Sequence, residues 1–189
     1  MRPVARWLPV FAFSCVLAGC HGTAHRERQD AVRLASFLSD RYEAYTQALE
    51  REQQAVIRVA EMVPEIVPRN GQYQCERLRQ GVLAPRETYG YLHDRLRKMR
   101  VSSEAGKNTQ REILAHLKER ELALFRFSTL LKGASDSFAS LHGVTMAPQV
   151  RQFRKAVAEH GSPKDRLGAI LDRLCRTYNI KRADLPQPV

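Results

Sequence analysis

Apolar residues that recur every seven positions are the feature that most constrains the fold of this chain. The first such segment contains two rows, Ala35, Tyr42, Leu49, Val56, Val63 and Leu38, Tyr45, Glu52, Val59, Ile66. The rows alternate at spacings of three and four, so they share one face of an α-helix. Pro64 and Pro68 follow, and each removes a backbone donor. We therefore expect a long helix over about residues 30–63, with Asp30 as its N-cap.

A second segment of the same kind predicts a second long helix over about residues 108–141. Its rows are Leu117, Leu124, Leu131, Phe138 and Ile113, Arg120, Phe127, Ala134, Leu141. Shorter helical patterns cover residues 75–82, 85–99, 148–161 and 162–178, and Ser162 and Pro163 are typical of a helix start. Convincing strand alternation is absent from the sequence. The chain is therefore predicted to be an all-α bundle, a single domain over residues 30–180, with its two long helices parallel or antiparallel.

Each long helix carries one charged residue in its apolar face, Glu52 in the first and Arg120 in the second. An unpaired buried charge is costly. Two arrangements avoid that cost. The side chains can meet as a buried pair, or each can reach solvent along its own helix, which is the more ordinary behaviour of long charged side chains.

The N-terminus has the organisation of an export signal. Basic residues Arg2 and Arg6 precede an uncharged run over residues 7–19. As a helix this run would rise about 20 Å, which is too short for a hydrocarbon core of about 30 Å. We therefore expect a signal peptide and not a membrane-spanning helix.

The end of this run, Leu17-Ala18-Gly19-Cys20, resembles the lipobox of bacterial lipoproteins, and the resemblance covers residues 1–20 only. It implies that residues 1–19 are removed and that Cys20 becomes the diacylated first residue of the mature chain. Residues 20–29 would then form the lipidated N-terminus and a tether. Since residue 21 is His and not Asp, the resemblance implies the periplasmic face of the outer membrane. An ordinary secretory signal is the alternative.

Two further cysteines, Cys75 and Cys175, remain in the mature chain. Exported proteins meet an oxidising compartment, so we predict that these two residues form a disulfide between the middle of the chain and its last helix. In the chain-entropy model, closing a loop of about 100 residues contributes up to ~4.7 kcal/mol. The alternative is a pair of buried free thiols.

Sequence motifs for catalysis are lacking. The chain contains no H-E-x-x-H, no G-x-S-x-G, no phosphate-binding loop and no zinc-type cysteine or histidine cluster. We therefore predict no catalytic residues, no metal and no cofactor.

Basic residues suggest an anionic contact. The formal net charge is +11, and the densest cationic run comprises Arg95, Arg97, Lys98 and Arg100. In the envelope such a run favours anionic lipid or lipopolysaccharide phosphates, although an ordinary solvated helix face is the alternative. Nucleic acid is not expected as a partner, because export removes it. Residues 181–189 read as a flexible tail.

Together these features favour a non-enzymatic envelope lipoprotein that acts as an accessory or assembly factor and binds another envelope protein. A tethered helical domain without catalytic motifs is the basis of this hypothesis. Two alternatives are an immunity or exclusion lipoprotein that inhibits a foreign toxin or hydrolase, and a cell-wall enzyme without a readable motif.

The lipidation site gives the first testable prediction. Labelled palmitate should enter the wild-type protein and should not enter Cys20→Ser, because the thiol of Cys20 is the acyl acceptor. Cys15→Ser serves as a control and should still be labelled, since Cys15 leaves with the signal. Equal labelling of the wild type and Cys20→Ser would contradict the lipoprotein assignment.

Overall fold

Helices form almost all of the part of the chain that the structure describes. The computed structural model describes residues 10–66, 68–140, 147–160 and 163–186. Within these ranges it contains the helices α1 (Val10–Met62), α2 (Gly71–Arg97), α3 (Glu104–Ser140), α4 (Ala147–His160) and α5 (Arg166–Tyr178), with short 3-10 turns between or after them. The all-α prediction is confirmed. None of the described helices is long and apolar enough to cross a lipid bilayer.

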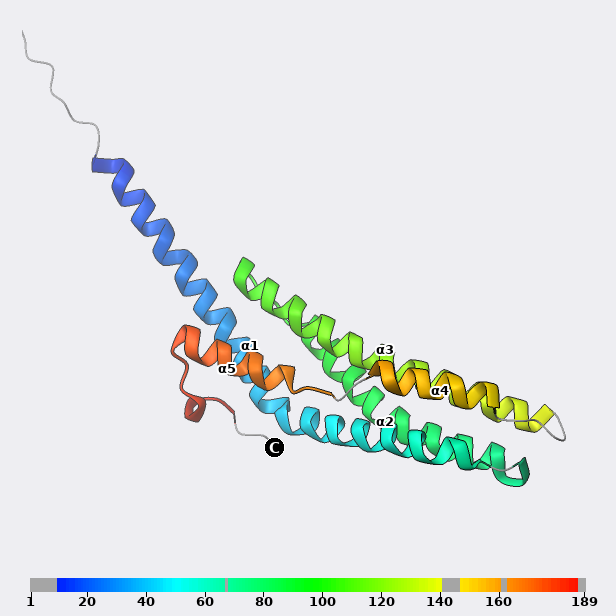
Figure 1. Ribbon diagram of the computed structural model, residues 1–189. Helices are drawn as coiled ribbons and strands as arrows, with labels where there is room; N and C mark the ends of the chain where they lie inside the picture. Colours follow the sequence, from blue (N-terminus) through cyan, green and yellow to red (C-terminus); the bar gives the residue numbers. More distant parts are fainter. Residues whose placement is uncertain (1–9, 67, 141–146, 161–162, 187–189) are drawn as a thin grey trace, which may run out of the picture.

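The chain runs alternately up and down the bundle. α1, α2 and α3 follow one another as antiparallel neighbours, and α4 and α5 then return end to end along α1 and α3 (Figure 1). The two long helices are therefore parallel, because the whole of α2 reverses the chain between them. The predicted helix over 108–141 corresponds to α3, and the predicted helix over 148–161 corresponds to α4.

The middle of the chain forms one helix where the sequence indicates two. α2 continues through Pro85, although an internal proline removes one hydrogen bond and costs about 3 kcal/mol. Its buried residues alternate at spacings of three and four without interruption: Cys75, Leu78, Val82, Pro85, Tyr89, Leu92 and Leu96. This stripe packs between α1 and α3. Burial along the whole stripe therefore outweighs the local cost of the proline.

α1 begins well before Asp30, the residue at which the sequence places the helix start. Residues 22–29, predicted as part of an irregular tether, are helical and mostly exposed. In Figure 1 this part of α1 projects beyond the other helices. A helical tether of nine residues spans about 13 Å, whereas an extended one reaches about 30 Å.

The side chain of Asp30 does not cap its own helix but binds the turn before α3. Its Oδ2 accepts hydrogen bonds from the backbone N–H of Ser102 at 2.9 Å and of Ser103 at 2.6 Å, and from the Ser102 hydroxyl at 3.1 Å. Ser103 in turn accepts from the N–H of Gly106 at 3.1 Å. Asp30 is fully buried. Burial alone would raise the pKa of Asp30, but the hydrogen bonds from Ser103 and Ser102 hold it below its usual value.

The predicted disulfide between Cys75 and Cys175 is absent, since both residues are free thiols. The start of α2 and the whole of α5 lie at different ends of the molecule (Figure 1). α5 is joined to α1 near Tyr42, which lies about 30 Å along α1 from its end at Met62. A disulfide requires two Cα atoms within about 7 Å of each other. Cys75 is instead part of the core, and burial raises the pKa of its thiol to about 11.

The last helix and the tail are fixed to α1. The N-cap of α5 is Asp165, three residues after the predicted Ser162, and its Oδ1 accepts from the N–H of Gly168 at 2.8 Å. The hydroxyl of Tyr42 donates to the same carboxylate. Burial and the Asp165 carboxylate together raise the pKa of Tyr42 to about 12. The predicted flexible tail is docked as far as it is described, because Leu185 is buried and the Pro186 carbonyl accepts from Ser39 at 2.9 Å.

The contact of Asp30 with the turn before α3 gives the second prediction. Asp30→Ala should lower the free energy of unfolding by about 1–3 kcal/mol, because two backbone amides lose their acceptor. Asp30→Asn keeps an acceptor and should lose less. Urea denaturation measures both, with the exposed Glu61→Ala as the control, expected to change stability by at most about 0.5 kcal/mol. If Asp30→Ala is as stable as the control, the assignment of this contact is wrong.

Candidate functional site

A buried polar cluster lies at the centre of the bundle and draws one residue from each of four helices. It consists of Glu52 from α1, Tyr89 from α2, Arg120 from α3 and His160 from α4. We refer to these four residues as the Glu52 cluster. Glu52 is 0% exposed, and the side chain of Arg120 is 9% exposed. The two charged residues that interrupt the apolar faces therefore meet, and the expectation that each reaches solvent is wrong.

The carboxylate of Glu52 accepts hydrogen bonds on both of its oxygens. Oε2 receives the Tyr89 hydroxyl at 2.7 Å and the Arg120 Nε at 3.2 Å. Oε1 receives the Arg120 Nη2, and it lies 2.8 Å from Nε2 of His160. The same Nε2 lies 2.9 Å from the Arg120 Nη2. A protonated Nε2 donates to Glu52, and an unprotonated one accepts from Arg120, so the cluster is satisfied with either tautomer of His160.

These contacts keep Glu52 charged despite its burial. Removal from water would raise the pKa of the Glu52 carboxyl. The hydrogen bonds from His160, Arg120 and Tyr89 outweigh burial and hold that pKa below its usual value. The net shift of Tyr89 has the opposite sign, because burial and the Glu52 charge both raise the pKa of its phenol. The phenol is thus a hydrogen-bond donor at any physiological pH.

A second buried pair extends the polar network along the bundle. The Tyr45 hydroxyl lies 2.9 Å from Nε2 of His116, and it lies 3.4 Å from the carbonyl oxygen of Lys164. The rings of Tyr45 and Tyr89 meet edge to face with centroids 6.2 Å apart. Burial, together with the charges of Arg166 and Arg120, lowers the pKa of His116, so its imidazole is neutral in the folded protein. This pair links α1, α3 and the turn before α5.

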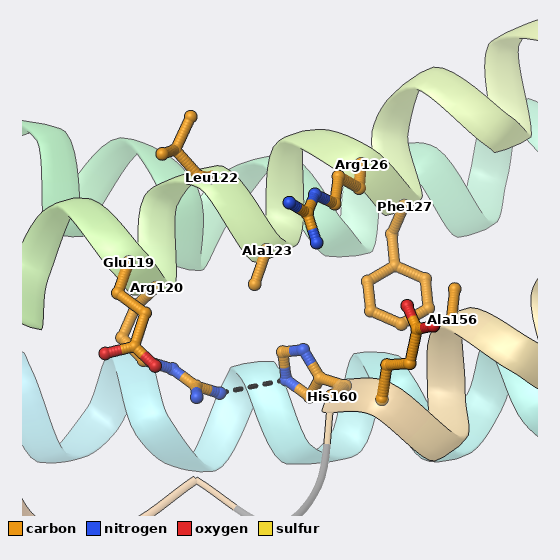
Figure 2. A pocket seen from close by; sticks show the side chains of 9 residues that line it. Glu119, Arg120, Leu122, Ala123, Arg126, Phe127, Ala156 and His160 are labelled. Carbon is orange, nitrogen blue, oxygen red and sulfur yellow. Dashed lines mark hydrogen bonds between the residues drawn. The ribbon is translucent and has the colours of Figure 1, made fainter.

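A pocket of about 240 Å³ opens beside the Glu52 cluster, between α3 and α4. Figure 2 shows His160 and Phe127 facing each other in it, and their ring centroids are 5.3 Å apart. The charged side chains of Glu119, Arg126 and Glu159 also line the pocket. The pocket is smaller than the roughly 300–1,000 Å³ of sites for drug-sized ligands, so it admits only a small group.

The chemistry that this pocket can support is limited by the contacts of its residues. Arg120 and His160 are already hydrogen-bonded to Glu52 or to each other. Among the described residues that line the pocket, none has a hydroxyl or thiol that could act as a nucleophile. The part of the chain that the structure describes also holds no group of three or more His, Cys, Asp or Glu residues placed to bind a metal. The arrangement is suited to holding four helices in register.

The residues singled out from the sequence lie in four different parts of the fold. Cys20 falls in α1, and its side chain lies outside the described part of the structure. The predicted anionic contact, Arg95, Arg97, Lys98 and Arg100, is exposed at the end of α2. Cys75 lies in the core and Cys175 is half-buried in α5.

Sequence reasoning identified Glu52 and Arg120 as unusual but missed Tyr89 and His160. Tyr89 belongs to an apolar stripe, where a tyrosine is unremarkable. His160 is the last residue of α4 and has no characteristic spacing to Glu52 or Arg120. No motif could have revealed a contact among four helices.

Comparison of the chain with protein-family models, with curated proteins and with solved structures gives no match. The functional interpretation therefore depends on the residues and their geometry.

The Glu52 cluster gives the third prediction. Glu52→Gln and Arg120→Gln should each lower the free energy of unfolding by about 3–5 kcal/mol, because each leaves its partner buried and unpaired. The double variant should lose clearly less than the sum, with a coupling energy of roughly 1–3 kcal/mol. Urea denaturation of the four proteins measures the cycle.

The exposed pair Glu112–Arg173 is the matched control for this cycle, since it joins α3 to α5 at the surface. Its coupling should be below about 1 kcal/mol. Since the folded-state pKa of Glu52 is lowered, its stabilisation is present above the unfolded-state pKa and is lost as pH falls through the folded-state value. Glu52→Gln should flatten this acid dependence. A coupling no larger than that of the surface pair would show that the buried contact does not form.

Proposed function

We propose that this chain is a lipid-anchored envelope protein that is not an enzyme and that binds another envelope protein through its helical bundle. Cys20 is the proposed anchor, and the periplasmic face of the outer membrane is the proposed location. The observation that carries the proposal is the arrangement at one end of the bundle. There α1 projects beyond the other helices (Figure 1), and the cations that follow one another at the end of α2 are exposed.

The contact of Asp30 with the turn before α3 brings the anchor and the basic residues to the same end. Only Val101 separates Ser102 and Ser103, which bind Asp30, from the end of the cationic run at Arg100. About 15 Å of helix separates Cys20 from Asp30. Each cation close to an anionic membrane surface contributes about 1 kcal/mol to binding. This geometry supports contact of Arg95, Arg97, Lys98 and Arg100 with anionic lipid or lipopolysaccharide phosphates.

The middle of α3 offers a surface for a protein partner. Leu122 and Phe125 lie on neighbouring turns of α3 and are 47% and 48% exposed. The guanidinium of Arg86 lies 4.9 Å from the centre of the Phe125 ring. Figure 2 shows Leu122 directed away from His160, on the outer side of α3. We call Leu122 and Phe125 of α3, together with Arg86 of the neighbouring α2, the α3 face.

The composition of the α3 face indicates the chemistry of its partner. Aromatic and arginine side chains are the residues most enriched at the energetic centres of protein interfaces. An apolar helix would cover Leu122 and Phe125. Arg86 is already paired with Glu121 at 3.9 Å, so its guanidinium serves to hold the Phe125 ring in place. The pocket beside the Glu52 cluster opens from the same helix and would take one side chain of that partner.

The state of the Glu52 cluster supports a role without catalysis. Perturbed titratable groups in a cleft are candidates for catalysis. In the Glu52 cluster, however, the perturbed groups are hydrogen-bonded to one another across four helices. Binding a substrate there would break contacts that hold the bundle together.

Photo-crosslinking in intact cells tests the proposed function. A photo-crosslinking amino acid in place of Leu122 should yield one stoichiometric product with an endogenous envelope protein. The same amino acid in place of the exposed Gln53 on α1 is the control and should yield far less. Phe125→Ser should reduce the Leu122 product while changing the stability of the protein by at most about 1 kcal/mol.

Three other results would argue against this function. A product no stronger at Leu122 than at Gln53 removes the basis for the α3 face. Capture of only an added foreign toxin or hydrolase would favour an inhibitor of the immunity or exclusion type. Turnover of purified peptidoglycan that is lost in a single carboxylate variant would favour a cell-wall enzyme.

A further inference from the structure

A second hollow, unrelated to the Glu52 cluster, lies in the hairpin of α1 and α2 and has a volume of about 240 Å³. Small residues make up part of its lining, beside the apolar side chains of Met62 and Leu78. Ala55 comes from α1, and Gly81 and Ala84 come from α2. A Cβ atom built on Gly81 would meet nothing within 4 Å. The hollow therefore arises because small residues occupy these positions along neighbouring helices.

Three arginines line this hollow, which we call the arginine groove. Arg51 and Arg58 are two helical turns apart on α1, and Arg77 comes from α2. All three are exposed, and none has a carboxylate within 4 Å among the described residues. Gln54 adds an amide to the lining, which includes no acidic residue among those described.

Two other arginines of α2 are paired with carboxylates. Arg79 is paired with Glu76 at 3.0 Å, and Arg86 lies 3.9 Å from Glu121. Positive charge is thus neutralised next to the groove but not within it. Three like charges around one hollow repel one another, and an anion bound among them would relieve that repulsion.

The number of guanidinium groups indicates which anion fits. Each guanidinium presents a planar fork of N–H donors that matches carboxylate or phosphate oxygens. A carboxylate offers two oxygens and one charge. A phosphate monoester offers three terminal oxygens and a charge of about −1.5 to −2 at neutral pH. Only the phosphate monoester has an oxygen for each of three guanidinium groups.

We propose that the arginine groove, formed by Arg51, Arg58 and Arg77 between α1 and α2, binds a phosphate monoester group. The volume of about 240 Å³ admits a phosphoryl group with a small substituent. Two sources present this chemistry, namely a soluble phosphorylated metabolite and a lipid head group.

The groove lies far from the proposed anchor. Arg51 is 31 residues after Cys20 in one continuous helix, which corresponds to about 46 Å of helix length. A head group in the anchoring membrane reaches the groove only if the bundle lies along the membrane surface. A soluble phosphate monoester reaches it in any orientation.

Calorimetric titration of the purified full chain in detergent micelles tests the proposal. Glycerol 3-phosphate should bind, and acetate at the same ionic strength should not. The Arg58→Gln/Arg77→Gln variant should lose at least about tenfold in affinity, because two of the three charge-assisted contacts are removed. The control variant Arg69→Gln/Arg151→Gln removes the same charge from exposed positions outside the groove and should bind like the wild type.

A second titration distinguishes the two sources of the phosphate group. Dioctanoyl phosphatidic acid in the same micelles presents the group on a lipid, and preferential binding of it supports a head group. Equal or weaker binding than glycerol 3-phosphate supports a soluble ligand. Equal binding by the groove variant and the wild type, or equal binding of acetate and phosphate, would overturn the proposal. These titrations need no protein partner, so their outcome is independent of the crosslinking test at Leu122.

Discussion

The arrangement of the bundle depends on the buried carboxylate of Glu52. It has no access to water, and it is satisfied only when Tyr89, Arg120 and His160 arrive from three other helices at the same level. Such a contact adds little net stability compared with apolar packing, but a shift of one helix by a single turn would leave a charge buried and unpaired. We interpret the cluster as the feature that selects this register from the many that apolar stripes permit.

The contact of Asp30 with Ser102 and Ser103 plays a comparable part at the end of the bundle. It ties the projecting part of α1 to the turn between α2 and α3, and so it sets the exposed cations of α2 beside the proposed anchor. The α3 face and the arginine groove lie further along the bundle. In the proposed function the basic end therefore meets the membrane, while the rest of the bundle remains available to a protein partner and to a phosphate group.

The two long helices could be predicted from the seven-residue rows, because a stripe of that period stabilises only a helix. The details that failed involve competition between local and tertiary effects. Pro85 should end a helix, yet the unbroken buried stripe of α2 carries the helix through it. The predicted disulfide between Cys75 and Cys175 rests on the argument that an oxidising compartment links two thiols. The start of α2, which carries Cys75, and α5, which carries Cys175, lie at different ends of the molecule. The redox state of a compartment does not indicate how far apart two cysteines lie in the folded protein.

The sequence by itself determined the helical class, the parts of each helix that face inward, and the presence of one unexpected charge in each long apolar face. These properties follow from spacing along the chain, which local geometry converts directly into a face of a helix. Only the tertiary structure decided that Glu52 and Arg120 meet, that Tyr89 and His160 join them, and that three arginines border one groove. Those contacts join residues 37–108 positions apart or lie between neighbouring helices. They depend on the relative register of the helices, which no single helix encodes.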